Sequence, residues 1–303
     1  MFSGKRGAAI LSIIVIICLI VLKVVVGILT GSLSTMAQAV DSFLDLFAVA
    51  ITFLAIRVAI KPADTEHPFG HGKAENIAAI AQAILIFLAG GSIIYSAIRR
   101  ITTGATIALT EAAIGVMIVS IIASIFLSRH LLRTAKATES TALEANAHNI
   151  AADVYSAGAV LVGLLLVRFT GLSIIDSILA ILVALFIFKV AYDVLRNSVG
   201  GLVDVKLPEE EEGIIKSAII EHIGQLVEFH ALRTRKAGSQ RYIDLHLVMP
   251  KKTSVEEAHQ LCDHLEDDIC SKLPNTDVTI HVEPCDENCD QCPVTLKLCK
   301  KKH

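Results

Sequence analysis

The sequence contains no tryptophan, and aromatic residues make up only 5% of it. Any belt of side chains at a membrane–water interface must therefore consist of Tyr, Phe, Lys and Arg. Charged residues account for only 19%, and the net charge is −3. This balance of charge argues neither for nucleic acid nor for a strongly acidic partner, and we expect no nucleic-acid partner.

Several motifs that indicate enzymes are also missing. The sequence has no phosphate-binding P-loop, no dinucleotide-binding fingerprint and no HExxH motif. Nothing in it therefore predicts an organic cofactor or the open ligand position and general base of a metalloenzyme. We expect a protein that is not an enzyme.

The sequence is instead rich in apolar residues. Hydrophobic residues make up 53% of the 303 residues, and the mean hydropathy is +0.63, which is too apolar for an ordinary soluble protein of this length. Each of its long apolar runs approaches the roughly 20 residues that a spanning helix needs. The predicted transmembrane helices cover residues 8–29, 34–60, 77–98, 108–133, 141–167 and 173–195.

The distribution of Lys and Arg predicts the orientation of these helices. If the N-terminus is cytoplasmic, most basic residues that flank the helices lie on the cytoplasmic side, whereas the other side has Arg99, Arg100 and Arg168. The first apolar run follows Lys5-Arg6 as in a signal peptide, but further spans follow it, so we expect it to be retained. We therefore predict a multi-pass protein of a prokaryotic inner or plasma membrane, with both termini in the cytoplasm.

After about residue 200 the composition becomes polar, and helical and strand patterns alternate. Helices are expected at 208–223 and 254–273, and strands at 226–233, 241–248 and 277–282. The order αββαβ predicts a small α+β domain. We therefore predict a six-helix transmembrane domain at 1–200, a cytoplasmic α+β domain at 201–284 and a Cys-rich tail at 285–303.

Two carboxylates lie within the second apolar run. Asp41 and Asp45 are one helical turn apart and share one face of the expected helix. An ionised carboxylate in hydrocarbon costs roughly 2.5–3.5 kcal/mol on insertion scales, so such groups usually face a cation, a proton path or water. The alternative is a pair of acids near a helix end that reaches headgroup water.

A second polar pair, Asn149 and Asp153, has the same spacing in the fifth run. Asn149 lies about 40° around the helix from Asp153, whereas His148 lies about 140° away. If the two pairs face each other, four oxygen-bearing side chains form a site for a divalent cation. The alternative is two independent polar positions on different helices.

The connection between the second and third runs contains Asp64, His67 and His71. A loop could bring this carboxylate and these imidazoles to one ion, forming an exposed mixed N/O site. The alternative is a loop whose histidines are simply solvated.

The polar third of the chain contains two further groups of potential ligands. The histidines and carboxylates expected on its sheet and second helix suggest metal binding, and the alternative is ordinary surface histidines. In the tail, Cys285, Cys289 and Cys292 could bind a metal as thiolates or serve a free-thiol or redox role. The candidate ligands of the sheet and helix are His230, His246, His259, Asp263, His281 and Glu283.

These motifs, in this order, resemble the cation diffusion facilitator family over about residues 8–284. The quoted features are the acid pair Asp41-x3-Asp45, the polar pair ending in Asp153, the loop 67–75 (HPFGHGKAE), and the segments 230–235 (HALRTR) and 281–284 (HVEP). The resemblance implies a homodimer that exports divalent metal ions in exchange for protons. It also implies six helices in the lipid bilayer and a ferredoxin-like cytoplasmic domain.

The resemblance also assigns roles to residues. The transport site would fall on Asp41, Asp45, Asn149 and Asp153, and the loop site on Asp64, His67 and His71. The cytoplasmic ligands named above would bind metal between subunits and steady the dimer. Lys73 and Asp204 occupy the positions of a charge interlock between the membrane and soluble parts.

Asn149 stands where zinc exporters of the family usually have His. An all-oxygen site reduces the advantage of Zn(II) and suits harder ions, and the family's manganese-handling branch has Asn there. The sequence therefore favours Mn(II), unless His148 or another rotation of the helix restores a nitrogen ligand. The alternatives are a Zn(II), Fe(II), Co(II) or Cd(II) exporter of the same family, or a membrane-bound metal sensor.

Overall fold

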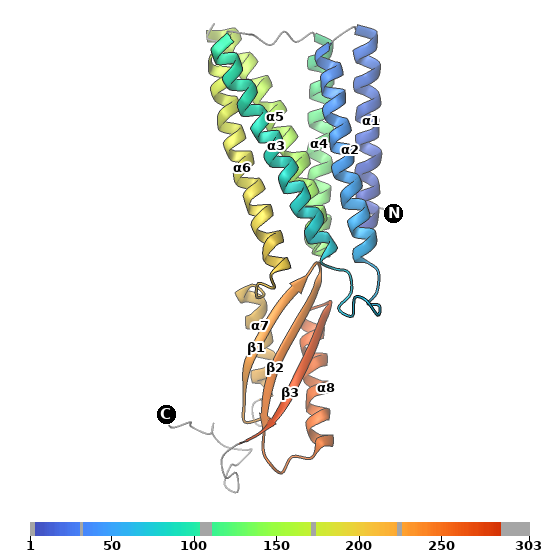
Figure 1. Ribbon diagram of the computed structural model, residues 1–303, viewed down its shortest axis with the longest axis vertical. Coiled ribbons are helices and arrows are strands. Elements are labelled where there is room, and N and C mark those ends of the chain that lie inside the picture. The colour runs from blue at the N-terminus through green and yellow to red at the C-terminus, as the bar shows by residue number, and fades with distance from the viewer. Residues whose placement is uncertain (1–3, 31–32, 104–110, 171–173, 223–225, 286–303) are drawn as a thin grey trace. The chain divides into compact units, whose positions relative to one another are not determined.

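The computed structural model describes most of the chain and divides it into two compact units, Met1–Val199 and Gly200–His303. The first unit is helical, and the second combines helices with a small sheet (Figure 1). The residues described are 4–30, 33–103, 111–170, 174–222 and 226–285.

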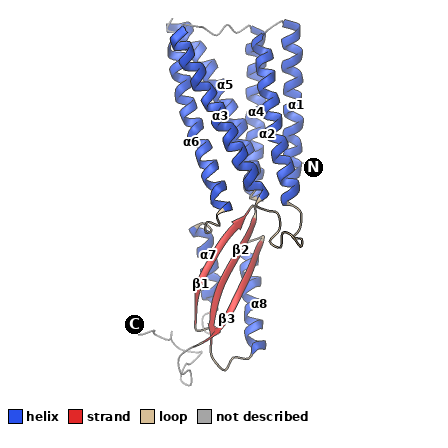
Figure 2. Cartoon of the chain, in the orientation of Figure 1, coloured by secondary structure: helices blue, strands red, loops and turns tan. Residues whose placement is uncertain are grey.

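Six long helices make up the described part of the first unit, the last of them running into the second (Figure 2). They are α1 (Lys5–Thr30), α2 (Leu33–Ala59), α3 (Ala74–Thr103), α4 (Glu111–Thr138), α5 (Thr141–Thr170) and α6 (Ile174–Leu202). Among the described residues, α1, α3, α4 and α6 contain stretches long and apolar enough to cross a membrane. The predicted spans of α2 and α5, which carry the polar pairs, remain predictions.

The first unit has an apolar core to which α1, α2, α4 and α5 contribute. Ile56 of α2, Leu131 of α4 and Leu143 of α5 are fully buried in one cluster. Many large apolar side chains instead face outward, as expected for helices that lipid surrounds, because lipid solvates them.

One buried ion pair ties three of these helices together. Lys5 Nζ of α1 lies 2.7 Å from Glu75 Oε1 of α3, and Glu75 is only 1% exposed. The hydroxyl of Ser140, just before α5, donates to the other carboxylate oxygen of Glu75. A buried carboxylate needs such partners because an unpaired charge in a protein interior is costly.

The second unit contains the predicted αββαβ order. Its elements are α7 (Glu209–Glu221), β1 (Glu228–Ala237), β2 (Gln240–Met249), α8 (Val255–Lys272) and β3 (Thr276–Pro284). The strands form a sheet of order β1-β2-β3, in which β1 pairs with β2 antiparallel and β2 pairs with β3 parallel. The prediction of a helical membrane domain followed by an α+β domain is confirmed.

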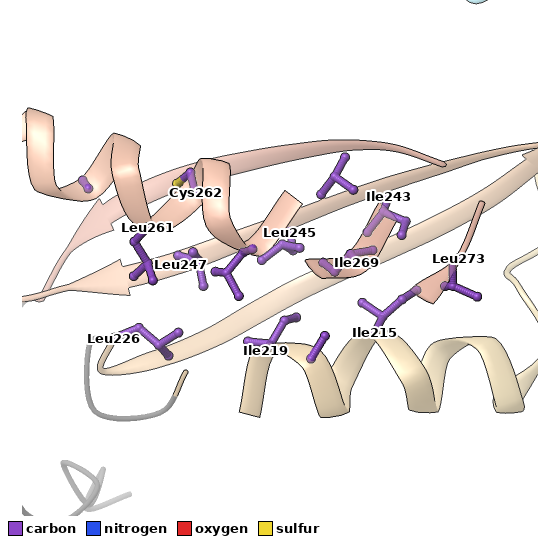
Figure 3. Packing of buried hydrophobic residues seen from close by; sticks show 14 of the residues in the cluster. Ile215, Ile219, Leu226, Ile243, Leu245, Leu247, Leu261, Cys262, Ile269 and Leu273 are labelled. Carbon is purple, nitrogen blue, oxygen red and sulfur yellow. The ribbon is translucent and has the colours of Figure 1, made fainter. Parts of the chain in front are cut away.

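Both helices of this unit share one apolar core with the sheet. Figure 3 shows Ile215 and Ile219 of α7 close to side chains of β2 and α8. Leu245 and Leu247 alternate along β2 with the more exposed Asp244 and His246. Because successive side chains of a strand point to opposite faces, His246 lies on the face away from the apolar core.

The strands depart from the predicted boundaries in β1. The expected turn at 236–239 is present as a tight turn with Gly238 at φ 61°. However, β1 continues to Ala237 through a bulge between His230 and Arg233, where Ala231 has φ 52°. The predicted strand 226–233 already contained this bulge, and it ended too early because the following residues, up to Lys236, are all polar and show no alternation.

Helix α8 begins with a capping box, which gives a first prediction. The hydroxyl of Ser254 accepts from the Glu257 amide at 3.2 Å, and Glu257 Oε2 accepts from the Ser254 amide at 2.9 Å. We expect Ser254→Ala to destabilise the start of α8 by about 1 kcal/mol. Hydrogen exchange of the first-turn amides should then be about fivefold faster, because 1 kcal/mol corresponds to this factor.

A matched control is Glu256→Gln in the same turn, whose side chain is exposed and takes no part in the box.

The hydrogen bonds from Ser254 also hold the pKa of Glu257 below its usual value of 4.5. A carboxyl with a lowered pKa contributes stability above its unfolded pKa and loses it as pH falls through the folded one. Equal exchange rates in Ser254→Ala and Glu256→Gln would contradict the role of the cap.

Candidate metal sites

The predicted site on the second and fifth helices lies where α2 and α5 are neighbours. Val49 and Ile56 of α2 share an apolar cluster with Leu143 and Ile150 of α5. This packing holds the two polar pairs on adjacent helices, as the prediction requires.

The described side chains of this site differ in exposure. Asn149 is buried, with 8% of its surface exposed, Asp45 is half-buried and Asp153 is exposed. The Asp41 side chain lies outside what the structure describes. The coming together of all four groups on one ion therefore remains a prediction.

The loop between α2 and α3 does bring its three predicted ligands together. Asp64 Oδ1 lies 3.3 Å from His67 Nδ1, and Asp64 Oδ2 lies 3.4 Å from His71 Nε2. One ligand atom from each residue lies within 4.8 Å of the others. Such spacing suits a three-ligand site for one divalent cation, with room for further ligands on its exposed side.

Backbone amides of this loop hold the Asp64 carboxylate in place through hydrogen bonds. The Oδ1 atom of Asp64 accepts from the backbone amide of His67 at 2.7 Å and from that of Glu66 at 3.1 Å. The hydrogen bond from the His67 backbone is the main reason that the pKa of Asp64 lies below its ordinary value. The carboxylate is therefore ionised and oriented over a wide pH range, as a metal ligand must be.

A second cluster lies on the face of the sheet away from its helices. His230, His246 and His281 are aligned directly across β1, β2 and β3. The ring centroids of neighbouring histidines are 5.3 Å and 4.9 Å apart. The row places three imidazoles side by side on a partly exposed surface.

Glu283 joins this row of histidines. Its Oε1 atom lies 2.8 Å from His246 Nδ1, and its Oε2 atom lies 3.3 Å from His230 Nε2. The His281 Nε2 atom is 3.7 Å from Oε1 of the same carboxylate. Four of the six predicted cytoplasmic ligands therefore converge within one chain, and the carboxylate could bridge two ions or bind one.

The other two predicted ligands form a separate pair. His259 Nδ1 lies 3.4 Å from Asp263 Oδ1, one turn apart on an exposed face of α8. This helix packs on the opposite face of the sheet from the histidine row. The prediction that they complete a metal site between two subunits stays a prediction.

The structure also shows a cluster that the sequence analysis missed. His222 at the end of α7 lies beside His264 and Asp268 of α8, with ligand atoms within 4.8 Å of one another. His264 and Asp268 have the same one-turn spacing as His259 and Asp263, and this spacing is the signal that could have found them. The third member was missed because no pattern in the sequence places the end of α7 against α8.

Two remaining predictions fall partly outside the described structure. Cys285 is buried, and its backbone amide donates to Met249 at the end of β2, whereas Cys289 and Cys292 lie outside the described residues. Lys73 belongs to the first unit and Asp204 to the second, where Asp204 lies 3.5 Å from Arg235. The charge interlock and the thiol site therefore remain predictions.

Comparison with known proteins gives matches along nearly the whole chain. The profile of a family described as the cation efflux transmembrane domain matches residues 9–203, and that of the cytoplasmic domain of cation efflux proteins matches residues 207–285. The cation-efflux pump FieF of Pectobacterium atrosepticum is 35% identical over 277 residues, which are 91% of this chain and 92% of the relative. The transporter sll1263 of Synechocystis sp. is 31% identical over 282 residues, 93% of this chain and 91% of the relative. A solved structure of CzrB in its Zn form is 44% identical, covers 28% of this chain and 97% of that chain, and has a TM-score of 0.27.

Proposed function

The chain belongs to the cation efflux, or cation diffusion facilitator, family, and from this membership we propose that it exports Mn(II) in exchange for protons. It is a divalent-cation efflux transporter of the membrane and not an enzyme. The proposed transport site consists of Asp41, Asp45, Asn149 and Asp153.

The observation that carries the choice of Mn(II) is Asn149. Its side chain is buried on α5, one turn before Asp153 and next to the packed α2. An amide and three carboxylates supply only oxygen ligands, which suit a hard divalent ion such as Mn(II). A histidine there would supply the nitrogen that Zn(II) binds well.

Proton exchange follows from the same carboxylates. A carboxylate oxygen binds either a proton or a metal ion, so the two cargoes compete for one site. Metal entering from the cytoplasm would displace protons, and protons from the other side would displace the metal after the helices rock around the site. Asn149 does not titrate, so all the exchanged protons must come from the aspartates.

The second unit would act as a cytoplasmic domain that pairs two subunits. The family domain matched there supports a homodimer, and the row of histidines with Glu283 supplies the corresponding metal site. His259 and Asp263 would contribute from their own surface of α8, and the 285–303 tail would add thiolate ligands. Metal binding at these sites would favour the transport-ready state if that state binds metal more tightly.

The remaining parts of the proposal concern the membrane unit. The loop site of Asp64, His67 and His71 would collect ions near the ends of α2 and α3. Lys73 and Asp204 would couple the two units through opposite charges. Both termini would lie in the cytoplasm of a prokaryotic cell, with six helices in the bilayer.

The test is metal flux into proteoliposomes under an imposed pH gradient, with Mn(II), Zn(II), Fe(II), Co(II) and Cd(II) compared for the wild type and Asn149→His. We expect the wild type to prefer Mn(II), and the variant to shift the Mn(II)/Zn(II) flux ratio toward Zn(II) by at least about tenfold, or about 1.4 kcal/mol. Flux that does not follow the pH gradient would contradict proton exchange.

His148→Ala is the matched control for this experiment, since His148 is the neighbouring residue that could supply a nitrogen ligand. We expect its flux ratio to stay that of the wild type, because the side chain lies about 100° around the helix from Asn149. If the wild type moves Zn(II) best and His148→Ala removes that preference, the all-oxygen site is wrong.

A further inference from the structure

The cluster of His222, His264 and Asp268 lies on the helical side of the second unit. His222 caps the C-terminal end of α7, and the other two residues lie one turn apart on the neighbouring α8. The histidine row with Glu283 lies on the opposite face of the sheet, because His246 points away from the core that α7 and α8 cover. The two clusters are therefore separate sites.

The contacts of His222 fix which of its nitrogens carries a proton. Its Nδ1 atom lies 2.9 Å from the backbone oxygen of Ala218, which can only accept a hydrogen bond. Nδ1 must therefore be the donor, and in the neutral ring Nε2 keeps its lone pair. This lone pair faces Asp268 Oδ2 at 3.3 Å.

Two lone pairs at this distance require a cation between them. The cation is either a proton, carried by Nε2 or by Oδ2, or a metal ion bound by both atoms. Tetrahedral Zn(II) with bonds of about 2.0–2.1 Å places neighbouring ligand atoms about 3.3–3.4 Å apart. The observed distance of 3.3 Å between His222 Nε2 and Asp268 Oδ2 matches this separation of two ligand atoms.

His264 supplies a third ligand on the same side. Its ring centroid lies 5.0 Å from that of His222, at an interplanar angle of 76°. The His222 side chain is 10% exposed and that of Asp268 is 32% exposed, while His264 is exposed to solvent. The cluster is therefore held firmly at His222 and open toward water, which leaves a fourth position for a water molecule.

We propose that His222, His264 and Asp268 bind a divalent transition metal of the Zn(II) class within one subunit. Two imidazoles and one carboxylate form a typical ligand set for Zn(II), and the hydrogen bond from Nδ1 to Ala218 is the outer contact that orients a zinc-binding histidine. A metal here joins the end of α7 to α8 beside the Lys272–Glu221 ion pair, whose charged atoms are 2.9 Å apart. This site does not depend on which ion the membrane unit transports.

The test uses the full chain with Asp45→Ala, His71→Ala and His246→Ala combined, so that the transport site, the loop site and the histidine row each lack a ligand. Co(II) is the probe, because a tetrahedral N/O site gives visible absorption bands while tail thiolates would add a near-ultraviolet charge-transfer band. We expect about one Co(II) per chain to give the visible bands and to be displaced by Zn(II), whereas any Co(II) on the tail thiolates is counted separately by the near-ultraviolet band. Adding His264→Ala should weaken this binding at least about 100-fold.

Two further variants guard against misfolding. Asp268→Asn keeps the shape of the side chain but removes its charge, and we expect a similar loss of Co(II) binding. Gln260→Ala alters an exposed position one turn before His264 and should leave the binding unchanged. If the combined variant binds no Co(II), or if His264→Ala and Asp268→Asn bind it as before, a proton bridges His222 and Asp268 and the metal site is refuted.

Discussion

Replacing Asp45 by Ala is expected to lower metal flux in proteoliposomes to the level of protein-free vesicles. Asp45 is half-buried on α2, next to the packed α5 that carries Asn149 and Asp153. Loss of an outer contact to a metal ligand already costs 10–100-fold, so loss of a charged ligand should cost at least about 100-fold. Proton movement coupled to metal should disappear together with the metal flux, because in the proposed exchange both cargoes use the same carboxylates.

Asp193→Ala is the control for this loss, since Asp193 is an exposed carboxylate on α6 outside the proposed site. Its flux should remain within about twofold of the wild type, as expected for a surface substitution. If Asp45→Ala retained more than a tenth of the wild-type flux, the proposed path through α2 and α5 would be wrong. A chain that moved no metal even as wild type but responded to it would instead favour a membrane-bound sensor.

Arg241→Ala is expected to destabilise the second unit by about 3–5 kcal/mol, the usual cost of removing one partner of a buried ion pair. Arg241 is the second residue of β2 and is only 3% exposed. Its Nε and Nη2 atoms donate to the two carboxylate oxygens of Glu211 on α7, at 2.7 Å and 3.1 Å. Its Nη1 atom donates to the backbone oxygen of Pro274 at 2.8 Å. One side chain thus joins β2, α7 and the segment before β3.

The measurement is hydrogen exchange of β2 and β3 amides in the full chain, which reports local opening of this unit. Exchange should accelerate by more than about 100-fold, since each 1.4 kcal/mol corresponds to a factor of ten. Arg233→Ala serves as the control, because Arg233 is an exposed residue of the same sheet whose loss should cost less than about 1 kcal/mol. Equal acceleration in both variants would mean that charge, rather than the buried contacts of Arg241, sets the stability.

The sequence predicted the elements of both units well because their patterns are local. Apolar runs placed most ends of the six helices within about three residues of the observed ones, although α6 ends at Leu202 instead of 195. The helix expected at 254–273 is α8 at Val255–Lys272. The loop ligands Asp64, His67 and His71 are close in the sequence, so a short turn suffices to bring them together. Periodicity and short spacing are therefore sufficient evidence for such features.

Features that depend on packing between distant segments could not be read in this way. His222 joins His264 and Asp268 only because α7 and α8 cover the same face of the sheet. Asn149 and Asp153 share a helical face by spacing, yet one is buried and the other exposed, since burial depends on neighbouring helices. Contacts of this kind require the three-dimensional arrangement, which no local pattern encodes.

The bulge in β1 determines on which face of the sheet His230 lies. Beyond the bulge, Thr234 of β1 pairs with Ile243 of β2. If this register continued along β1 without the extra residue, His230 would lie opposite Leu247, on the face that packs against the helices. With the bulge, His230 instead lies opposite His246. Because side chains alternate between the two faces of a strand, a single inserted residue moves His230 from the face of the apolar core to the face of the histidine row. A deletion of one residue at this bulge would therefore move His230 out of the row without changing any of the row's residues.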